Sequence, residues 1–208
     1  MPMSSILLIG NGETVSAKLL RQLTRQASAV VAADGGATKA LRAGIVPDGV
    51  VGDLDSISKK DAKALRSHIH AVSSQQNTDL EKALYYVTHT FDVREVTLVG
   101  FVGDRWDFCF GNLLHLATYA RKLDMTLAGD GWRIHILTRG ASFPAKLKKR
   151  VSLIPLTRCS GVTLTGLKYP LFGETLPVGT TRSLSNETAA KQFSVYFSRG
   201  TLLLYREV

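Results

Sequence analysis

The sequence predicts an α/β protein in which an N-terminal parallel sheet with flanking helices is followed by a C-terminal all-β sandwich. Over residues 1–130, short apolar runs alternate with segments that have helical spacing. Over residues 131–208, short β-rich runs are separated by Pro, Gly and Ser-rich turns. Acidic and glycine-rich motifs follow the N-terminal apolar runs, as they do in ligand-binding α/β sheets. We therefore divide the chain into residues 1–130 and 131–208.

Strands are expected in the N-terminal part where apolar runs end at glycine or aspartate, and helices where apolar residues recur every three to four positions. The expected strands are Ser5–Ile9, Ala29–Ala33, a run ending at Val50–Val51, Ile69–Val72, Val96–Val99 and Met125–Ala128. The expected helices are Val15–Gln26, Thr38–Ala43, Ser58–Ser67, Asp79–Thr88 and Trp106–Lys122. Thr78 is the expected N-cap of the fourth helix, and Glu81 completes a capping box. Such alternation predicts a parallel sheet with helices on both faces.

The C-terminal part lacks any stretch that fits a helix of three turns. Its expected strands are Arg133–Thr138, Val151–Leu156, Val162–Leu167, Thr181–Leu184, Phe193–Phe197 and Thr201–Tyr205, with a hairpin turn at Ser198–Gly200. Several short strands with regular turns are typical of a small sandwich.

Composition narrows the class of protein. The apolar fraction of 45% is enough for a proper core, and two cysteines make no disulfide framework, which favours the cytoplasm. We expect no signal peptide and no membrane span, because no apolar run approaches about 18 residues. The net charge of +9 is concentrated in residues 141–208, which contain 10 Lys and Arg but only 3 Asp and Glu. The densest basic run, Lys146–Arg150, is interpreted as a solvated loop or hairpin face.

The double aspartate Asp53 and Asp55 is the strongest chemical motif, because it directly follows a predicted strand. Carboxylates without nearby Cys or His favour Mg²⁺ over zinc or copper. Asp79, at the start of a predicted helix, is the third candidate ligand. Mg²⁺ takes one or two carboxylates together with substrate phosphates, so the motif predicts a nucleotide site. A solvated acidic turn is the structural alternative.

Glycine turns and basic residues accompany the carboxylates. Gly10–Gly12 and Gly35-Gly36 open predicted helices, whose N-termini attract phosphate, although neither matches a known phosphate-loop pattern. Lys82 and Arg105 are candidates to neutralise phosphate charge. The alternatives are ordinary tight turns, a surface lysine, and a salt bridge between Arg105 and Asp107 at the start of a helix. His115 and His135 are interpreted as structural, and no Ser/His/Asp motif is present.

Taken together, these motifs resemble the thiamine pyrophosphokinase family. The resemblance is carried, in order along nearly the whole chain, by Ala33–Ala37, Pro47-Asp48, Gly52–Ser56, Thr78–Ala83, Gly166–Leu171 and Ser183–Glu187. It implies an α/β domain and a β-sandwich assembled as a homodimer, with transfer of a pyrophosphoryl group from ATP to the thiamine hydroxyl and release of AMP.

The resemblance also implies roles for individual residues. Residues matching the Mg²⁺ ligands are Asp53, Asp55 and Asp79, and these count as catalytic together with Lys82 and Arg105. Nucleotide and phosphate contacts are implied for Asp34, Gly35, Gly36, Lys82 and Arg105. Thiamine contacts are implied for Gln75, Asp107, Tyr169, Ser185 and Asn186, with Tyr169 reaching thiamine bound by the partner subunit.

The chain departs from the family at one motif. Family members usually carry Gly-Gly-Arg-x-Asp-His after the fifth strand, and this chain has Gly103-Asp104-Arg105-Trp106-Asp107-Phe108. Arginine and aspartate are kept, whereas Asp104 replaces a glycine and Phe108 replaces the histidine.

Other functions remain compatible with these motifs. A pyrophosphokinase of the same fold that acts on another primary alcohol, such as a hydroxymethylpterin, is the nearest alternative. A metal-dependent glycosyltransferase could use the same Asp-x-Asp. A dehalogenase-type phosphatase is disfavoured because Gly10–Gly12 occupies the place of its nucleophile. We expect no nucleic-acid partner, because the basic segment has no arrayed aromatic residues.

Overall fold

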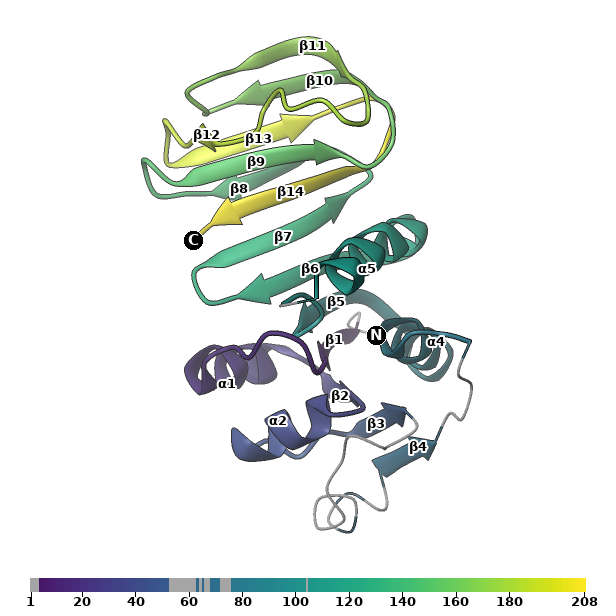
Figure 1. Ribbon diagram of the computed structural model, residues 1–208. Helices are drawn as coiled ribbons and strands as arrows, with labels where there is room; N and C mark the ends of the chain where they lie inside the picture. The colour runs from purple at the N-terminus through teal and green to yellow at the C-terminus, as the bar shows by residue number, and fades with distance from the viewer. Residues whose placement is uncertain (1–3, 53–62, 64, 66–67, 72–75, 104) are drawn as a thin grey trace. The chain divides into compact units, whose positions relative to one another are not determined.

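The computed structural model describes residues 4–52, 63, 65, 68–71, 76–103 and 105–208 (Figure 1). The chain falls into two compact units, one of Met1–His115 with Leu127–Asp130 and the other of Leu116–Thr126 with Gly131–Val208. We call them the α/β unit and the β unit. Residues 116–126 thus cluster with the β unit, and the functional division predicted at residue 130 stays a prediction.

The α/β unit is built on parallel strands. They are β1 (Ser4–Ile9), β2 (Ala29–Ala33), β3 (Gly49–Gly52), β4 (Ile69–Ala71) and β5 (Val93–Val99), in the spatial order β5-β1-β2-β3-β4. Leu7 of β1 is paired with Val30 on one side and Thr97 on the other. β6 (Asp124–Gly129) follows beside β5. The parallel sheet predicted from the alternating pattern is confirmed.

Helices cover both faces of this sheet. They are α1 (Ala17–Gln26), α2 (Gly36–Arg42), α4 (Asp79–Thr90) and α5 (Trp106–Tyr119). Figure 1 shows α1 and α2 on one face and α4 and α5 on the other. The chain runs from β1 outward to β4 and then returns to β5 beside β1, and right-handed crossovers require helices on opposite faces for these two directions. The strand order therefore reverses between β1 and β5.

Caps decide where the helices begin. Ser16 Oγ accepts the N–H of Leu19 over 3.2 Å, and Asp130 accepts hydrogen bonds from both the N–H and the hydroxyl of Ser16 over 2.6 Å. α1 consequently begins at Ala17 rather than at the predicted Val15. Thr78 caps α4 as predicted, because its Oγ1 accepts the N–H of Glu81 over 3.3 Å. The predicted helix at 58–67 lies largely outside the described residues.

Burial follows the periodicity of the sequence. Ile6, Leu7, Leu8 and Ile9 of β1 are all at most 2% exposed, as expected for a strand with a helix on each face. The apolar stripe of α1, at Leu19, Leu20 and Leu23, packs on the same core. Each such side chain contributes about 1.5–3 kcal/mol of burial free energy.

The β unit is a sandwich of two antiparallel sheets, as predicted. Its strands are β7 (Trp132–Leu137), β8 (Ala141–Pro144), β9 (Arg150–Pro155), β10 (Cys159–Thr165), β11 (Leu171–Leu176), β12 (Asn186–Glu187), β13 (Gln192–Tyr196) and β14 (Leu202–Glu207). Within this unit, the strands of one sheet follow the order β12-β9-β14-β7, and a separate four-stranded sheet has the order β11-β10-β13-β8. Leu153 and Leu204 of the first sheet and Leu164, Phe193 and Val195 of the second belong to one buried cluster.

Thr181–Leu184 was wrongly predicted as a strand. Residues 182–185 form a turn, and Ser183 and Ser185 have φ values of 76° and 53°. Left-handed backbone at alternate residues is incompatible with an extended strand. The strands at β8 and β11 were missed because Pro144 and Gly173 reduce their strand propensity.

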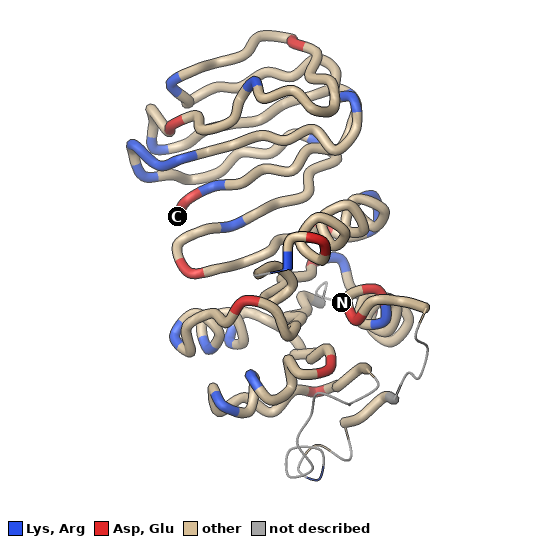
Figure 2. Tube along the Cα trace, in the orientation of Figure 1, with Lys and Arg blue, Asp and Glu red and all other residues tan. Residues whose placement is uncertain are grey.

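Charge and hydropathy complete the description. Figure 2 shows basic residues on α1 and α2 and on the loops of the β unit.

Cys109 and Cys159 are both buried and free. Among the described residues, no helix is both long enough and apolar enough to cross a membrane.

Candidate active site

The turns after β1 and β5 lie against each other at the point where the strand order reverses. The N–H of Gly10 donates to the carbonyl of Val99 over 2.8 Å, and the N–H of Gly12 donates to the carbonyl of Gly100 over 2.6 Å. Open α/β sheets bind ligands at such an edge, outside the carboxyl ends of their strands. The structure therefore brings the first glycine turn to the place where a ligand is expected.

Asp34 directly follows β2 at this edge and is 5% exposed. Its φ of 45° is a left-handed conformation that aspartate adopts more readily than most residues. Within the described part of the chain, its buried Oδ1 has no hydrogen-bond partner. Leaving such an atom unpaired costs about 1–3 kcal/mol, so the arrangement indicates a ligand that carries positive charge or donates a proton.

Gly52 packs against Asp34 and directly precedes the double aspartate motif in the sequence. Its φ is 153°, and a Cβ on Gly52 would lie 3.1 Å from the Cβ of Asp34. A side chain here would displace Asp34, which explains the glycine directly before Asp53. Asp53 and Asp55 lie outside the described residues, as do Gln75 and Asp104.

Gly35 and Gly36 begin α2 beneath the turn after β1. A Cβ on Gly36 would collide with the carbonyl oxygen of Ile9, and one on Gly35 would lie 2.5 Å from the side chain of Asn11. Close packing of α2 against this turn therefore explains both glycines. Their predicted contact with nucleotide stays a prediction.

The N-terminus of α4 presents an acid and a buried base. Asp79 is its first residue and is favoured there by the helix dipole. The ammonium of Lys82 lies 3.7 Å from the Asp79 carboxylate, and the Lys82 side chain is only 5% exposed. The alternative of an ordinary surface lysine is thus wrong, because a buried lysine needs a charged partner.

A cavity of about 360 Å³ opens between α4, α5 and the turns after β1 and β5. We call it the α4–α5 cavity. Asp79 and Arg105 line it together with Asn11, Gly12, Thr78, Leu80, Gly100, Phe101, Val102, Gly103, Phe108, Cys109 and Asn112. Asp79, a predicted metal ligand, and Arg105, a predicted phosphate contact, thus line one cavity.

Arg105 is held by the two residues that follow Trp106. Its Nε and one terminal nitrogen donate to the two carboxylate oxygens of Asp107 over 3.2 and 2.5 Å. The hydrogen bond lowers the pKa of Asp107 and raises the pKa of Arg105. The guanidinium also lies 4.2 Å from the centre of the Phe108 ring, a cation–π contact. The predicted alternative of an Arg105–Asp107 pair is present, and both groups remain mostly exposed.

Two buried residues of α5 hold the loop that carries Arg105. The Sγ of Cys109 accepts the N–H of Gly103 over 3.1 Å and donates to its carbonyl over 3.2 Å. The Nδ2 of Asn112 donates to the carbonyl of Phe101 over 2.7 Å. Neither residue was predicted from the sequence. The signal is their spacing, because Cys109 and Asn112 lie three residues apart on α5 and therefore share one helix face.

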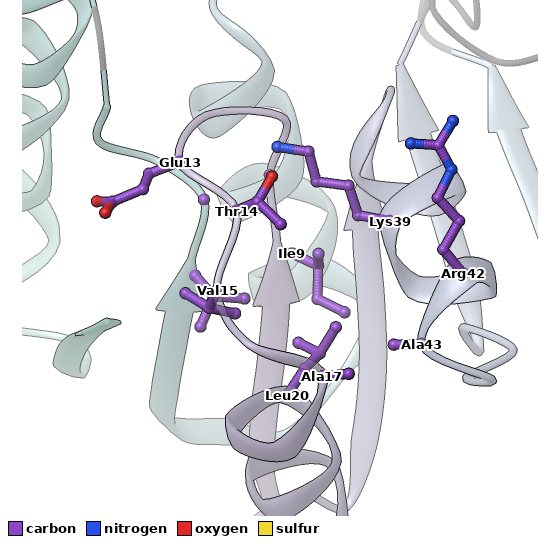
Figure 3. A pocket seen from close by; sticks show the side chains of 12 residues that line it. Ile9, Glu13, Thr14, Val15, Ala17, Leu20, Lys39, Arg42 and Ala43 are labelled. Carbon is purple, nitrogen blue, oxygen red and sulfur yellow. The ribbon is translucent and has the colours of Figure 1, made fainter. Parts of the chain in front are cut away.

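A second cavity, of about 210 Å³, is lined by residues of α1, α2 and the turn after β1 (Figure 3). We call it the α1–α2 cavity. Lys39 and Arg42 of α2 stand at its rim, and its other lining residues are Ile9, Gly10, Glu13, Thr14, Val15, Ala17, Leu20, Ala43, Val99 and Gly100. No role was predicted from the sequence for Lys39 or Arg42.

The β unit brings together Tyr169 and Asn186 from distant parts of its sequence. The N–H of Tyr169 donates to Asn186 Oδ1 over 3.0 Å, and Asn186 Nδ2 donates to the Tyr169 carbonyl over 2.7 Å. Asn186 is 1% exposed, whereas Tyr169 is 61% exposed. Both line a cavity of about 320 Å³ together with Arg182, which was not predicted because it falls within the strand expected at Thr181–Leu184.

Ser185 lies on the strained turn beside this cavity. Its N–H donates to Ser152 Oγ over 2.9 Å, which fixes the turn on β9. Arg182 forms an ion pair of 3.1 Å with Glu174. Backbone strain of this kind persists only where surrounding contacts impose it and is common at binding sites.

His135 lies in the β unit as a neutral, hydrogen-bonded side chain. Its Nδ1 lies 3.0 Å from Thr126 Oγ1, and its Nε2 accepts from Arg206 Nε over 3.2 Å. Burial, followed by the charges of Arg206 and Arg133, lowers the pKa of His135 to about 4.

Comparisons with known proteins agree with this arrangement. Residues 20–127 match the family described as "Thiamin pyrophosphokinase, catalytic domain", and residues 134–202 match "Thiamin pyrophosphokinase, vitamin B1 binding domain". The thiamine pyrophosphokinase of Bacillus subtilis (strain 168) is 27% identical over 214 residues, which cover 98% of this chain and 99% of the relative.

Solved structures of similar proteins share the fold. The crystal structure of thiamin pyrophosphokinase from Geobacillus thermodenitrificans has a TM-score of 0.84 at 26% identity and covers 98% of this chain and 97% of its own. The Bacillus subtilis structure has a TM-score of 0.87 at 24% identity, with coverages of 98% and 99%. Yeast thiamin pyrophosphokinase, at 18% identity and a TM-score of 0.82, covers all of this chain and 87% of its own.

Proposed function

The chain belongs to the thiamin pyrophosphokinase family, and we infer from this membership and from its cavities how individual residues take part in the reaction. The protein transfers a pyrophosphoryl group from ATP to the hydroxyl of thiamine, giving thiamine diphosphate and AMP. The observation that carries this function is that the two family matches follow one another along the chain. None of the matches supports the hydroxymethylpterin alternative.

We propose Mg²⁺ as the cofactor, held by Asp53, Asp55 and Asp79. The donor set fits chemically, because carboxylate oxygens are the ligands that Mg²⁺ prefers, and the described residues at this edge of the sheet include an unpaired, buried oxygen of Asp34. Gly52, which packs against Asp34, is the residue before Asp53 in the sequence. When bound, Mg²⁺ neutralises charge on the phosphate oxygens.

The chain itself supplies positive charge and position. We propose that Lys82 and Arg105 contact the phosphates, because Arg105 lines the α4–α5 cavity and Lys82 pairs with Asp79 at its border. Pyrophosphoryl transfer depends mainly on in-line positioning and charge neutralisation. The thiamine oxygen attacks the β-phosphorus, AMP leaves, and a carboxylate of this edge accepts the hydroxyl proton.

We propose that the β unit contributes the thiamine contacts. The exposed ring of Tyr169 suits the flat aminopyrimidine and the cationic thiazolium. The amide of Asn186 is already bonded to the backbone of Tyr169, which supports a positioning role rather than direct contact. Asp107 accepts a hydrogen bond from Arg105, so a contact with thiamine requires its carboxylate to interact with Arg105 and thiamine at the same time.

We further propose a homodimer in which Tyr169 reaches thiamine bound by the partner subunit, and a cytoplasmic location. Light scattering of the purified protein tests the first statement, and a mass of one chain at all concentrations contradicts it. Fractionation of cells that express the chain tests the second, and recovery outside the cytoplasm contradicts it.

The deciding experiment for the function is product analysis with ATP, Mg²⁺ and thiamine. We expect AMP and thiamine diphosphate in equal amounts, and no turnover after removal of Mg²⁺ by a chelator. ADP with thiamine monophosphate would overturn the assignment. A reaction with hydroxymethylpterin but none with thiamine would establish the alternative.

A further inference from the structure

The loop between β5 and α5 is held by hydrogen bonds along its whole described length. Residues 100–103 follow β5 directly, and each of their four carbonyl groups accepts a hydrogen bond from outside the loop. The donors come alternately from two sides, the turn after β1 and the helix α5. The loop is therefore fixed between these two elements, although it belongs to neither.

The turn after β1 supplies backbone donors. The N–H groups of Gly12 and Glu13 donate to the carbonyls of Gly100 and Val102, each over 2.6 Å. The two segments approach closely, since a Cβ on Gly12 would lie 2.6 Å from the carbonyl oxygen of Val102. This side of the loop is held by main-chain groups alone.

The helix α5 supplies side-chain donors on the other side. Asn112 Nδ2 donates to the carbonyl of Phe101 over 2.7 Å, and Cys109 Sγ donates to the carbonyl of Gly103 over 3.2 Å. Both donor residues are buried. Loss of either donor would leave a carbonyl without a partner beside a packed helix, which favours a different course of the loop.

Cys109 also connects the loop to the backbone of Arg105. Its Sγ accepts the N–H of Gly103 over 3.1 Å, and its own N–H donates to the carbonyl of Arg105 over 3.0 Å. Arg105 directly precedes α5 and lines the α4–α5 cavity. One buried residue thus contacts both the end of the loop and the residue that carries the guanidinium.

The side-chain contacts of Arg105 do not fix it relative to the sheet. Its guanidinium is paired with Asp107 and lies over the ring of Phe108. Both partners lie within three residues of Arg105, so they orient it relative to its own turn. Cys109 and Asn112 join this turn to the loop after β5, and they therefore orient it relative to the sheet edge.

We propose that Asn112 and Cys109 are positioning residues, which hold Arg105 in place for its contact with the transferred phosphates. They act through the loop at 100–103 and through the first turn of α5, and Arg105 makes the contact. Transfer reactions are sensitive to such placement, because a displacement of about 1 Å can lower the rate by about 100-fold. The proposal rests on the function proposed above, in which Arg105 is a phosphate contact.

The two cysteines give a matched pair of substitutions. Cys109→Ala and Cys159→Ala remove the same thiol from two buried positions, and Cys159 Sγ also donates to a carbonyl, that of Thr157, over 3.2 Å. We expect Cys109→Ala to lower kcat/KM for ATP about tenfold. Cys159→Ala should leave kcat/KM unchanged. Cys109→Ser, whose hydroxyl can still donate and accept, should recover most of the loss, and Tm values show that the variants are folded.

Asn112 is tested by a change of the same shape. Asn112→Asp replaces the donating amide by a carboxylate oxygen that repels the carbonyl of Phe101. It should lower kcat/KM for ATP about tenfold or more, and Asn112→Ala should lower it less because it removes the donor without adding the repulsion. Unaltered kinetics in folded Asn112→Asp would overturn the role of this residue.

A double-mutant cycle separates positioning from a merely structural role. Arg105→Ala removes the group on which both residues are proposed to act. In that background, Cys109→Ala and Asn112→Ala should therefore lower kcat/KM for ATP no further. Losses that multiply in the combined variants overturn the proposal, as do equal kinetics for Cys109→Ala and Cys159→Ala.

Binding of inorganic pyrophosphate keeps this proposal distinct from the proposed function. Calorimetry with pyrophosphate and Mg²⁺ needs neither thiamine nor turnover. If the protein makes no AMP but Cys109→Ala weakens pyrophosphate binding only while Arg105 is present, the function fails and the positioning stands. If AMP is formed but Cys109→Ala, Asn112→Ala and Cys159→Ala bind pyrophosphate and turn over alike, the positioning fails and the function stands.

Discussion

The two units position their candidate site residues by different means. In the α/β unit, Asp34 and Asp79 lie at the end of a strand and the start of a helix, so the regular elements place them at one edge of the sheet. In the β unit, Tyr169 is placed by the amide of a single buried residue, Asn186, next to a turn with left-handed serines. The comparison shows that site residues on regular elements follow from periodicity, whereas those on turns depend on individual side-chain contacts.

The largest effect is expected from Asp79 in the α/β unit. Asp79→Asn should lower kcat by about 10²–10³-fold, because it removes a charge that the proposed cation needs. Asp53→Asn and Asp55→Asn should act similarly. Asp92→Asn, an exposed acid in the connection between α4 and β5, is the control. Steady-state kinetics over a range of Mg²⁺ concentrations measures the effect, and near-normal turnover in all three variants excludes this metal site.

The pH dependence of stability tests the β unit. The pKa of His135 is about 4 in the folded protein against 6.5 when unfolded, so the unfolded state binds a proton first as pH falls. The stabilisation is fully present above pH 6.5 and is lost as the pH falls toward 4, by about 3 kcal/mol.

Urea unfolding at pH 7 and pH 4 measures this loss. His135→Gln should show a smaller decrease in unfolding free energy between the two values, by about 3 kcal/mol. Equal decreases in the two proteins would show that another group is responsible.

Asn186→Ala should separate positioning from direct contact. The substitution leaves backbone groups of Tyr169 and Glu187 without their partner and should cost about 1–3 kcal/mol of unfolding free energy. It should also raise the KM for thiamine. Asn186→Asp, which keeps one acceptor, should recover part of the stability. A raised KM with unchanged stability would instead favour direct contact with thiamine.

Tyr169→Ala should raise the KM for thiamine about tenfold and the KM for ATP little, since the lost cation–π attraction is about 0.5–2 kcal/mol. Tyr169→Phe should be mild because the ring provides the contact. Equal damage to both KM values, together with a lower Tm, would indicate a structural role.

The smallest effect is expected at Phe108. Phe108→Leu should raise the KM for ATP about two- to fivefold by removing the ring under Arg105, and Phe108→Tyr should restore it. Phe108→His should become less active below pH 6.5, where an imidazolium would repel Arg105. Identical pH profiles for Phe108→His and the unaltered enzyme would contradict this contact.

Much of the candidate site followed from sequence because its residues sit at boundaries of regular elements. The Thr78 cap and the glycine before Asp53 are local features that a linear pattern displays. The burial of Lys82 and the contact of Arg105 with Phe108 were beyond such a pattern, because they depend on how α4 and α5 lie against the sheet.

The sequence by itself determined the class of the fold, the order of the strands and of the described helices in the α/β unit, and the family, because hydrophobic periodicity and short motifs are local properties of the chain. Only the tertiary structure decided that 182–185 is a turn, that Asn186 holds Tyr169, and that Lys39 and Arg42 share a cavity with the floor of β1 and α1. These features depend on residues that are distant along the chain, and their contact energies exist only once the sheets and helices have packed.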